Sequence, residues 1–134
     1  MDWKIEVIQI PVSDVDRAKA FYADQLGFVD DLDLVLPTGS RLVQLTPPGS
    51  GCSIQLTTGM HTMPIGVLEG LQIVVDDIEA AKAHMDAQGV QAGPVQHFED
   101  GAWHDGKGGD WNSFVMFSDP DGNGWVLQER PAGN

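Results

Sequence analysis

The stretch Phe114–Gln128, which reads FVMFSDPDGNGWVLQ, decides the fold. Two β-prone runs, Phe114–Ser118 and Trp125–Gln128, flank the segment Asp119–Gly124. In that segment Pro120 presets its φ near the value a turn needs, and the glycines tolerate positive φ. The pattern predicts a β-hairpin. A hairpin by itself implies no function, so its significance depends on the rest of the chain.

The sequence around the first expected helix is repeated in the second half of the chain. Val12–Ala20 reads VSDVDRAKA, and Val75–Ala83 reads VDDIEAAKA, 63 residues later. Each copy follows a short apolar run, and β-like segments come after each. The period is about half of the 134 residues, which is too long for a solenoid. We therefore predict two β-α-β-β-β modules in one chain.

These modules divide the chain as follows. We expect residues 1–134 to form a single domain, with a first module at 3–58, a linker at 59–67 and a second module at 68–130. The linker is marked by Gly59, Pro64 and Gly66. The length suits one domain, with enough chain to bury roughly two thirds of its unfolded surface.

Two local features complete the expected architecture. Ser13 is expected to cap the first helix, with Asp16 as the acid of a capping box. Asp76 or Asp77 should cap the second. A short strand is expected over Pro94–Phe98, followed by a loop over Glu99–Asp110. A loop of that length inside a compact domain is often functional.

Charge and composition exclude several classes of function. The chain has 20 acidic and 7 basic residues, a net charge of −13. That charge argues against partners such as nucleic acid or an anionic membrane, which require basic patches. It would attract a cationic ligand, although an acidic proteome would give the same balance. There is no apolar run of about 18 residues and no signal-peptide pattern, so we expect a cytoplasmic protein that does not span a membrane. The single cysteine, Cys52, fits a reducing compartment.

The motifs resemble one known family. Val12–Tyr22, the following Leu26–Phe28 and the turn Asp119–Asn123 are similar to the vicinal oxygen chelate superfamily, which includes glyoxalase I, extradiol dioxygenases and bleomycin-resistance proteins. The resemblance covers nearly the whole chain. It implies an α+β fold in which two β-α-β-β-β modules form curled mixed sheets around a cavity. One such scaffold carries many functions, so the resemblance is more specific for fold than for chemistry.

The resemblance also implies where metal ligands would lie. Metal-dependent members have a histidine on the first strand of each module, which corresponds here to Val7 and Gly70. Their oxygen ligands lie on the last strand of each module, which corresponds to Gln55 and Val126. Three of these four positions have no side-chain donor, and a catalytic metal needs about three protein ligands. We therefore expect no metal and no cofactor.

Six residues are candidates for ligand binding. Strand periodicity places four glutamines on the faces that hold the family's ligand positions, and two tryptophans lie in the long loop and directly after it: Gln9, Gln55, Gln72, Gln128, Trp103 and Trp111. Inward-facing amides need hydrogen-bond partners, which a ligand, water or another glutamine could supply. A tryptophan suits aromatic ligands, but it can equally pack in the core or at a dimer interface. We expect such packing for Trp125.

Three functions remain open at this point. The first is a homodimeric, metal-free protein that binds or sequesters a small, partly aromatic molecule, for which the acidic charge would also suit a cation. The second is a lyase, isomerase or dioxygenase with a non-standard site, in which His97, His104, Glu99 or Asp110 would supply the acid or base. The third is a regulatory or assembly role. Superfamily members usually cover their sheet edges by pairing, so we expect a twofold dimer.

Overall fold

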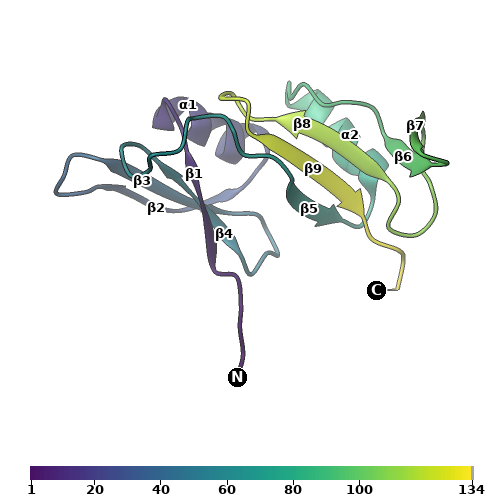
Figure 1. Ribbon diagram of the computed structural model, residues 1–134, viewed down its shortest axis with the longest axis horizontal. Helices are drawn as coiled ribbons and strands as arrows, with labels where there is room; N and C mark the ends of the chain where they lie inside the picture. Colours follow the sequence, from purple (N-terminus) through teal and green to yellow (C-terminus); the bar gives the residue numbers. More distant parts are fainter. Residues whose placement is uncertain (134) are drawn as a thin grey trace. The chain divides into compact units, whose positions relative to one another are not determined.

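The structure is a computed structural model that describes residues 1–133. The chain divides into two compact units (Figure 1). The first unit comprises Met1–Leu68 together with Pro120–Gly122. The second begins at Glu69, excludes those three residues and continues from Asn123. No helix among the described residues is both long and apolar enough to cross a membrane.

The first unit is one four-stranded sheet with a helix. Its elements are β1 (Val7–Pro11), α1 (Val15–Lys19), the π-helical turn η1 (Ala20–Gln25), β2 (Val29–Val35), β3 (Arg41–Thr46) and β4 (Ser53–Thr57). The strand order is β1-β4-β3-β2. β1 and β4 run parallel, and the other neighbours are antiparallel. The sheet is therefore mixed.

The second unit repeats this order with one strand added. Its elements are β5 (Leu71–Val75), α2 (Ile78–Ala87), β6 (Gln96–Glu99), β7 (Ala102–Asp105), β8 (Phe114–Ser118) and β9 (Gly124–Glu129). The strand order is β5-β9-β8-β6-β7, and β5 pairs with β9 in parallel. Because β7 only extends the edge, the chain has the expected α+β fold of two β-α-β-β-β modules with mixed sheets.

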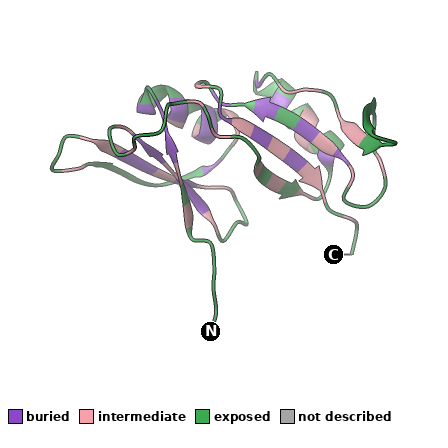
Figure 2. Cartoon of the chain, viewed as in Figure 1, coloured by how far each residue is buried: buried purple, intermediate pink, exposed green. Residues whose placement is uncertain are grey.

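Each unit buries one face of its sheet. In the first unit Ile10, Tyr22 and Leu56 are fully buried. In the second, Ile78 and Met85 of α2 are buried, as are alternate residues of the neighbouring strands: Val115, Phe117, Trp125 and Leu127. Figure 2 shows this alternation along β9. The rings of Phe117 and Trp125 stack 6.2 Å apart, so Trp125 lies in the core, as expected.

The first helix is capped differently from the sequence prediction. Asp14 is the N-cap, and its side chain accepts a hydrogen bond of 3.1 Å from the backbone N–H of Arg17. Ser13, the expected cap, is bonded instead to Asp121. A local pattern cannot reveal a partner 108 residues away, which is why the prediction failed. The second helix is capped by Asp77, one of the two residues expected.

The expected loop over 99–110 is largely a β-hairpin. β6 and β7 pair antiparallel, with Phe98 opposite Trp103. Asp100 and Gly101 connect them with φ values of 52° and 77°. Positive φ at both central residues defines the type I′ turn, for which Asp-Gly is a preferred sequence. The Asp-Gly pair was therefore an available signal for the hairpin.

Residues 120–122 are firmly bonded within the first unit. The Asp121 carboxylate accepts hydrogen bonds from the Ser13 hydroxyl at 2.5 Å, the Ser13 backbone N–H at 3.1 Å and Arg17 Nη2 at 3.1 Å. Its side chain is only 6% exposed. Gly66 lies so close that a Cβ there would be 2.1 Å from the Asp121 carbonyl oxygen. The tip of the fold-determining hairpin thus has fixed partners.

Candidate functional site

One face of the second sheet is open and apolar. Along β8 and β9, Val115 and Leu127 face α2, so their strand neighbours point to the opposite face. Met116 pairs with Val126 on that opposite face, and Phe114 pairs with Gln128. Met116 is 41% exposed. We call the surface formed by Gln72, Phe98, Trp103, Phe114, Met116, Val126 and Gln128 the open face.

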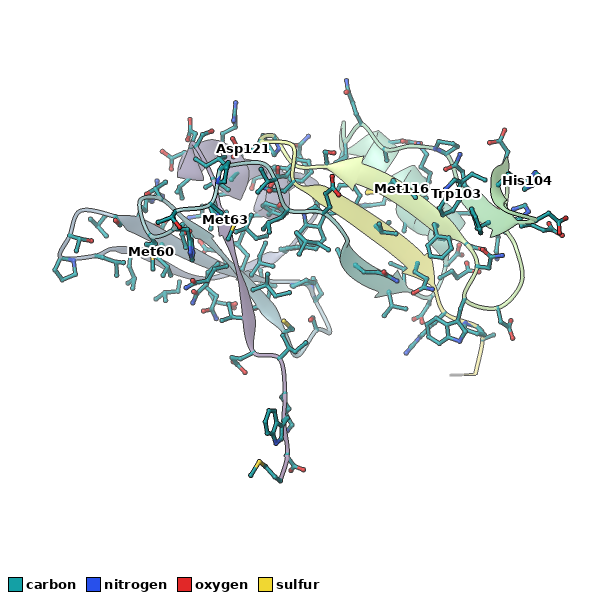
Figure 3. The ribbon with its side chains drawn as sticks, in the orientation of Figure 1. Met60, Met63, Trp103, His104, Met116 and Asp121 are labelled. Carbon is teal, nitrogen blue, oxygen red and sulfur yellow. The ribbon has the colours of Figure 1, made fainter. Side chains whose placement is uncertain are left out.

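Aromatic side chains cluster at the hairpin end of the open face. The Trp103 ring meets Phe98 edge-on at 5.4 Å and Phe114 at 5.6 Å. Trp103 remains 44% exposed and Phe98 48%. Figure 3 labels Trp103 on this hairpin and Met116 on β8. Exposed aromatic rings beside a thioether provide a large apolar surface for a flat ligand.

A pair of glutamines adds polar groups to this face. Gln72 Nε2 donates a hydrogen bond of 2.5 Å to Gln128 Oε1. Gln128 Nε2 in turn donates one of 2.7 Å to the backbone carbonyl of Trp111. Trp111 has a φ of 62°, and its ring is exposed. Residues in this left-handed region are uncommon outside glycine and often occur at functional sites.

A pocket of about 600 Å³ opens at the other end of β8 and β9. It is lined by Glu69, Gln91, Met116, Phe117, Ser118, Asp119, Gly124, Trp125 and Val126. Small-molecule pockets commonly have volumes of roughly 300–1,000 Å³. Asp119 already accepts hydrogen bonds of 2.9 and 2.8 Å from Asn123. Glu69 is therefore the lining carboxylate that has no partner among the described residues.

The glutamines of the first sheet bond to one another. Gln9 Nε2 donates to Gln55 Oε1 at 2.9 Å, and Gln55 Nε2 donates to Gln44 Oε1 at 2.9 Å. These three residues lie opposite one another in register across β1, β4 and β3. Mutual pairing was one of the arrangements that the sequence left open. Gln44, which sequence reasoning did not single out, completes the row.

The two histidine candidates lie on the other side of the β6–β7 hairpin from Trp103. His97 pairs with His104, one position along from the Phe98–Trp103 pair, and their rings stack at 5.5 Å. Alternation along the strands directs these imidazoles away from the aromatic cluster. His97 Nδ1 bonds the Gly106 carbonyl at 2.8 Å, and Nε2 meets Glu99 at 3.2 Å. The hairpin's histidines are therefore not part of the open face.

An ion pair holds the segment that follows β7. Glu129 accepts a hydrogen bond of 2.9 Å from the backbone N–H of Ile78 and an ion pair of 2.8 Å from Lys107. These contacts, the Ile78 N–H first, lower the pKa of the Glu129 carboxyl, and Glu129 raises the pKa of Lys107. The segment that leads to Trp111 is thus attached to the end of β9.

The residues at the family's ligand positions do not fit a divalent metal. Val7, Gly70 and Val126 have no donor atom, and the Gln55 amide is bonded to other glutamines. In the described part of the chain, no group of three or more His, Cys, Asp or Glu side chains could hold a metal ion. These positions therefore lack the set of about three protein ligands that a catalytic divalent metal needs.

The structure distributes the six predicted residues between the units. Gln9 and Gln55 lie in the first, while the other four belong to the second. Sequence reasoning missed Phe98, Phe114, Met116 and Glu69. Two sequence signals could have found three of these residues. The Asp-Gly turn sets Phe98 opposite Trp103. Alternation along the hairpin places Phe114 and Met116 on the same face as Val126.

Comparison with known proteins gives consistent matches. A family model for the glyoxalase/bleomycin resistance protein/dioxygenase superfamily matches residues 4–127. TnmS3, an antibiotic binding protein from Streptomyces sp. CB03234, is 34% identical, with a TM-score of 0.79 over 97% of this chain and 98% of that one. A glyoxalase/bleomycin resistance protein from the same organism is 35% identical, with a TM-score of 0.75 over 93% and 99%.

A third structure extends the comparison beyond that organism. A superfamily member from Sphaerobacter thermophilus DSM 20745 is 26% identical, with a TM-score of 0.78 over 96% of this chain and 98% of that chain. No curated protein sequence matches the chain.

Proposed function

This chain belongs to the glyoxalase/bleomycin resistance protein/dioxygenase superfamily, and from that premise we propose that it binds a small, partly aromatic molecule on the open face, without a metal. The proposal is one of binding or sequestration. The observation that carries it is the half-exposed cluster of Phe98, Trp103 and Phe114 beside Met116. Covering one large apolar side chain of this kind stabilises a complex by roughly 1–3 kcal/mol.

The polar groups near the open face suit the same kind of ligand. Gln72 and Gln128 can orient a ligand through hydrogen bonds, because small-molecule sites combine an apolar lining with a few polar groups. Glu69 places a carboxylate in the adjacent pocket. With a net charge of −13, the protein would favour a cationic ligand at low salt. The similarity to TnmS3, an antibiotic binding protein, also supports binding.

The enzymatic alternative has less support from the geometry. A general acid or base must reach the reacting atom directly or through one water. His97 and His104 point away from Trp103, and the titratable groups that line the adjacent pocket are the carboxylates of Glu69 and Asp119. The homodimer remains a prediction, which is taken up below.

The test is a titration of the full chain with planar aromatic compounds, both neutral and cationic. Binding is detected through the NMR signals of the tryptophan indole N–H groups. A binder should shift the signals of Trp103 and Trp111 but leave Trp3 unchanged. Trp103→Ala should weaken binding by roughly 1–3 kcal/mol. Trp3→Ala is the matched control, because Trp3 is 85% exposed and lies in the first unit.

Two outcomes would contradict this function. One is a confirmed ligand that binds wild type and Trp103→Ala equally well. The other is binding that disappears on addition of EDTA and returns with a divalent metal, since the proposed site uses only side chains and backbone.

A further inference from the structure

A backbone carbonyl fixes the orientation of the Gln128 amide. The carbonyl oxygen of Trp111 can only accept a hydrogen bond, so the Gln128 group 2.7 Å from it must be the NH₂. Oxygen and nitrogen of a glutamine amide are assigned from such networks, and here the network leaves one choice. The Gln128 carbonyl oxygen is therefore directed to Gln72.

This orientation determines what Gln72 offers to a ligand. Gln72 must place its own NH₂ against Gln128 Oε1, and it does so at 2.5 Å. Its remaining carbonyl oxygen, Oε1, has no hydrogen-bond partner within residues 1–133, and the residue is exposed. The row Gln9–Gln55–Gln44 differs, because no backbone carbonyl among residues 1–133 anchors it, so all of its amides could reverse together.

We infer that Gln72 is a specificity-determining residue whose carbonyl oxygen selects aromatic ligands carrying an N–H or O–H donor. The inference rests on the proposed function and narrows it to a class of ligand. A flat molecule that lacks a donor would displace water from the Gln72 carbonyl oxygen without replacing the lost hydrogen bond, which is unfavourable. The Glu69 carboxylate, which lies just before β5 and has no partner among the described residues, is also an acceptor and favours the same ligands.

The experiment compares two probes that differ in one donor. 2-Naphthol carries an O–H group, whereas 2-methoxynaphthalene has the same ring and no donor. Wild type should bind 2-naphthol about three- to tenfold more tightly, the effect of one net hydrogen bond. Gln72→Leu should abolish this preference and leave the affinity for 2-methoxynaphthalene equal or higher.

Two further variants separate this mechanism from a general loss of structure. Gln128→Met removes the anchor, so Gln72 can rotate and the preference should fall. Gln44→Leu alters the row of the first sheet and should leave both affinities unchanged. The two-dimensional NMR spectrum of each variant checks that it is folded. A preference that survives Gln72→Leu would overturn the inference.

The outcomes also distinguish this inference from the proposed function. Equal binding of both probes to wild type would refute the donor selectivity alone and leave aromatic binding intact. If neither probe binds to wild type, both the donor selectivity and the proposed binding of aromatic molecules are refuted.

Discussion

The Ser13 hydroxyl donates a hydrogen bond of 2.5 Å to the carboxylate of Asp121, 108 residues further along the chain. The same carboxylate accepts the backbone N–H of Ser13 and the guanidinium of Arg17, both at 3.1 Å. The Asp121 side chain is only 6% exposed, whereas Ser13 and Arg17 are exposed, so it is the carboxylate and not its donors that is shielded from water. The carboxylate thus organises the start of α1.

Replacing this carboxylate should destabilise the protein. We expect Asp121→Ala to lower the free energy of unfolding by about 1–3 kcal/mol, because it removes several hydrogen bonds to one charged and largely buried carboxylate. Urea denaturation measures the change. Asp86→Ala is the control: Asp86 pairs with Lys82 on the surface of α2 and should contribute less than about 1 kcal/mol. Equal losses in the two variants would contradict this role.

Gly66 should tolerate no side chain. Its φ is 82°, and a Cβ would lie 2.1 Å from the Asp121 carbonyl oxygen. Gly39 has a similar φ of 88° but open space around it, so Gly39→Ala measures the backbone cost alone, about 1 kcal/mol. Gly66→Ala should cost roughly 1–3 kcal/mol more, from the clash. Chemical denaturation of both variants tests this, and similar losses would show that the contact relaxes cheaply.

Glu129 should make stability depend on acid pH. The Ile78 N–H and Lys107 lower its pKa below its ordinary value of 4.5, so the folded state favours the ionised carboxylate. Its contribution is present above pH 4.5 and is lost as the pH falls through the folded pKa. The difference in the free energy of unfolding between wild type and Glu129→Gln, measured by urea denaturation, should therefore become smaller as the pH is lowered.

A second variant identifies which contact matters more for Glu129. Lys107→Met should leave the larger part of this pH dependence, because the Ile78 N–H is the larger cause of the lowered pKa. If Lys107→Met removes the pH dependence completely, the order of the two causes is wrong.

We expect the chain to form a twofold dimer. Several apolar side chains of the linker at residues 59–67 are about half exposed, and a partner chain would cover them: Met60, Met63, Ile65 and Val67. Sedimentation velocity at micromolar concentration should show a species near twice 14.5 kDa. Ile65→Asp should weaken the dimer, while Ala83→Asp, on the exposed surface of α2, should not. A single species of 14.5 kDa would contradict the prediction.

The sequence predicted the fold well where structure depends on neighbours in the chain. The repeat of Val12–Ala20 and the Asp119–Gly124 turn were sufficient for the two modules, and Asp77 capped its helix as expected. The cap at Ser13 was wrong because a distant carboxylate competes for its hydroxyl. The loop after Glu99 was partly wrong because the Asp-Gly turn was overlooked.

The candidate site was less accessible to sequence reasoning. Faces could be assigned by alternation, so Gln72 and Gln128 were correctly grouped with Val126. The Phe98–Trp103–Phe114 cluster depends on strand register, which becomes visible only when β6, β7 and β8 are paired. The direction of the Gln72 amide depends on a backbone carbonyl whose position no sequence pattern gives.

Under the proposed function, the left-handed backbone of Trp111 lowers folding stability at a residue whose ring is a candidate for ligand contact. Its φ of 62° costs a non-glycine residue roughly 1–2 kcal/mol. Trp111→Gly would relieve that cost and Trp111→Ala would not, although both remove the ring. A laboratory selection for heat resistance alone should therefore drift to glycine at this position. A selection that also required capture of an aromatic compound should retain the tryptophan, and comparing the two populations would measure how much folding stability the site gives up for its ligand.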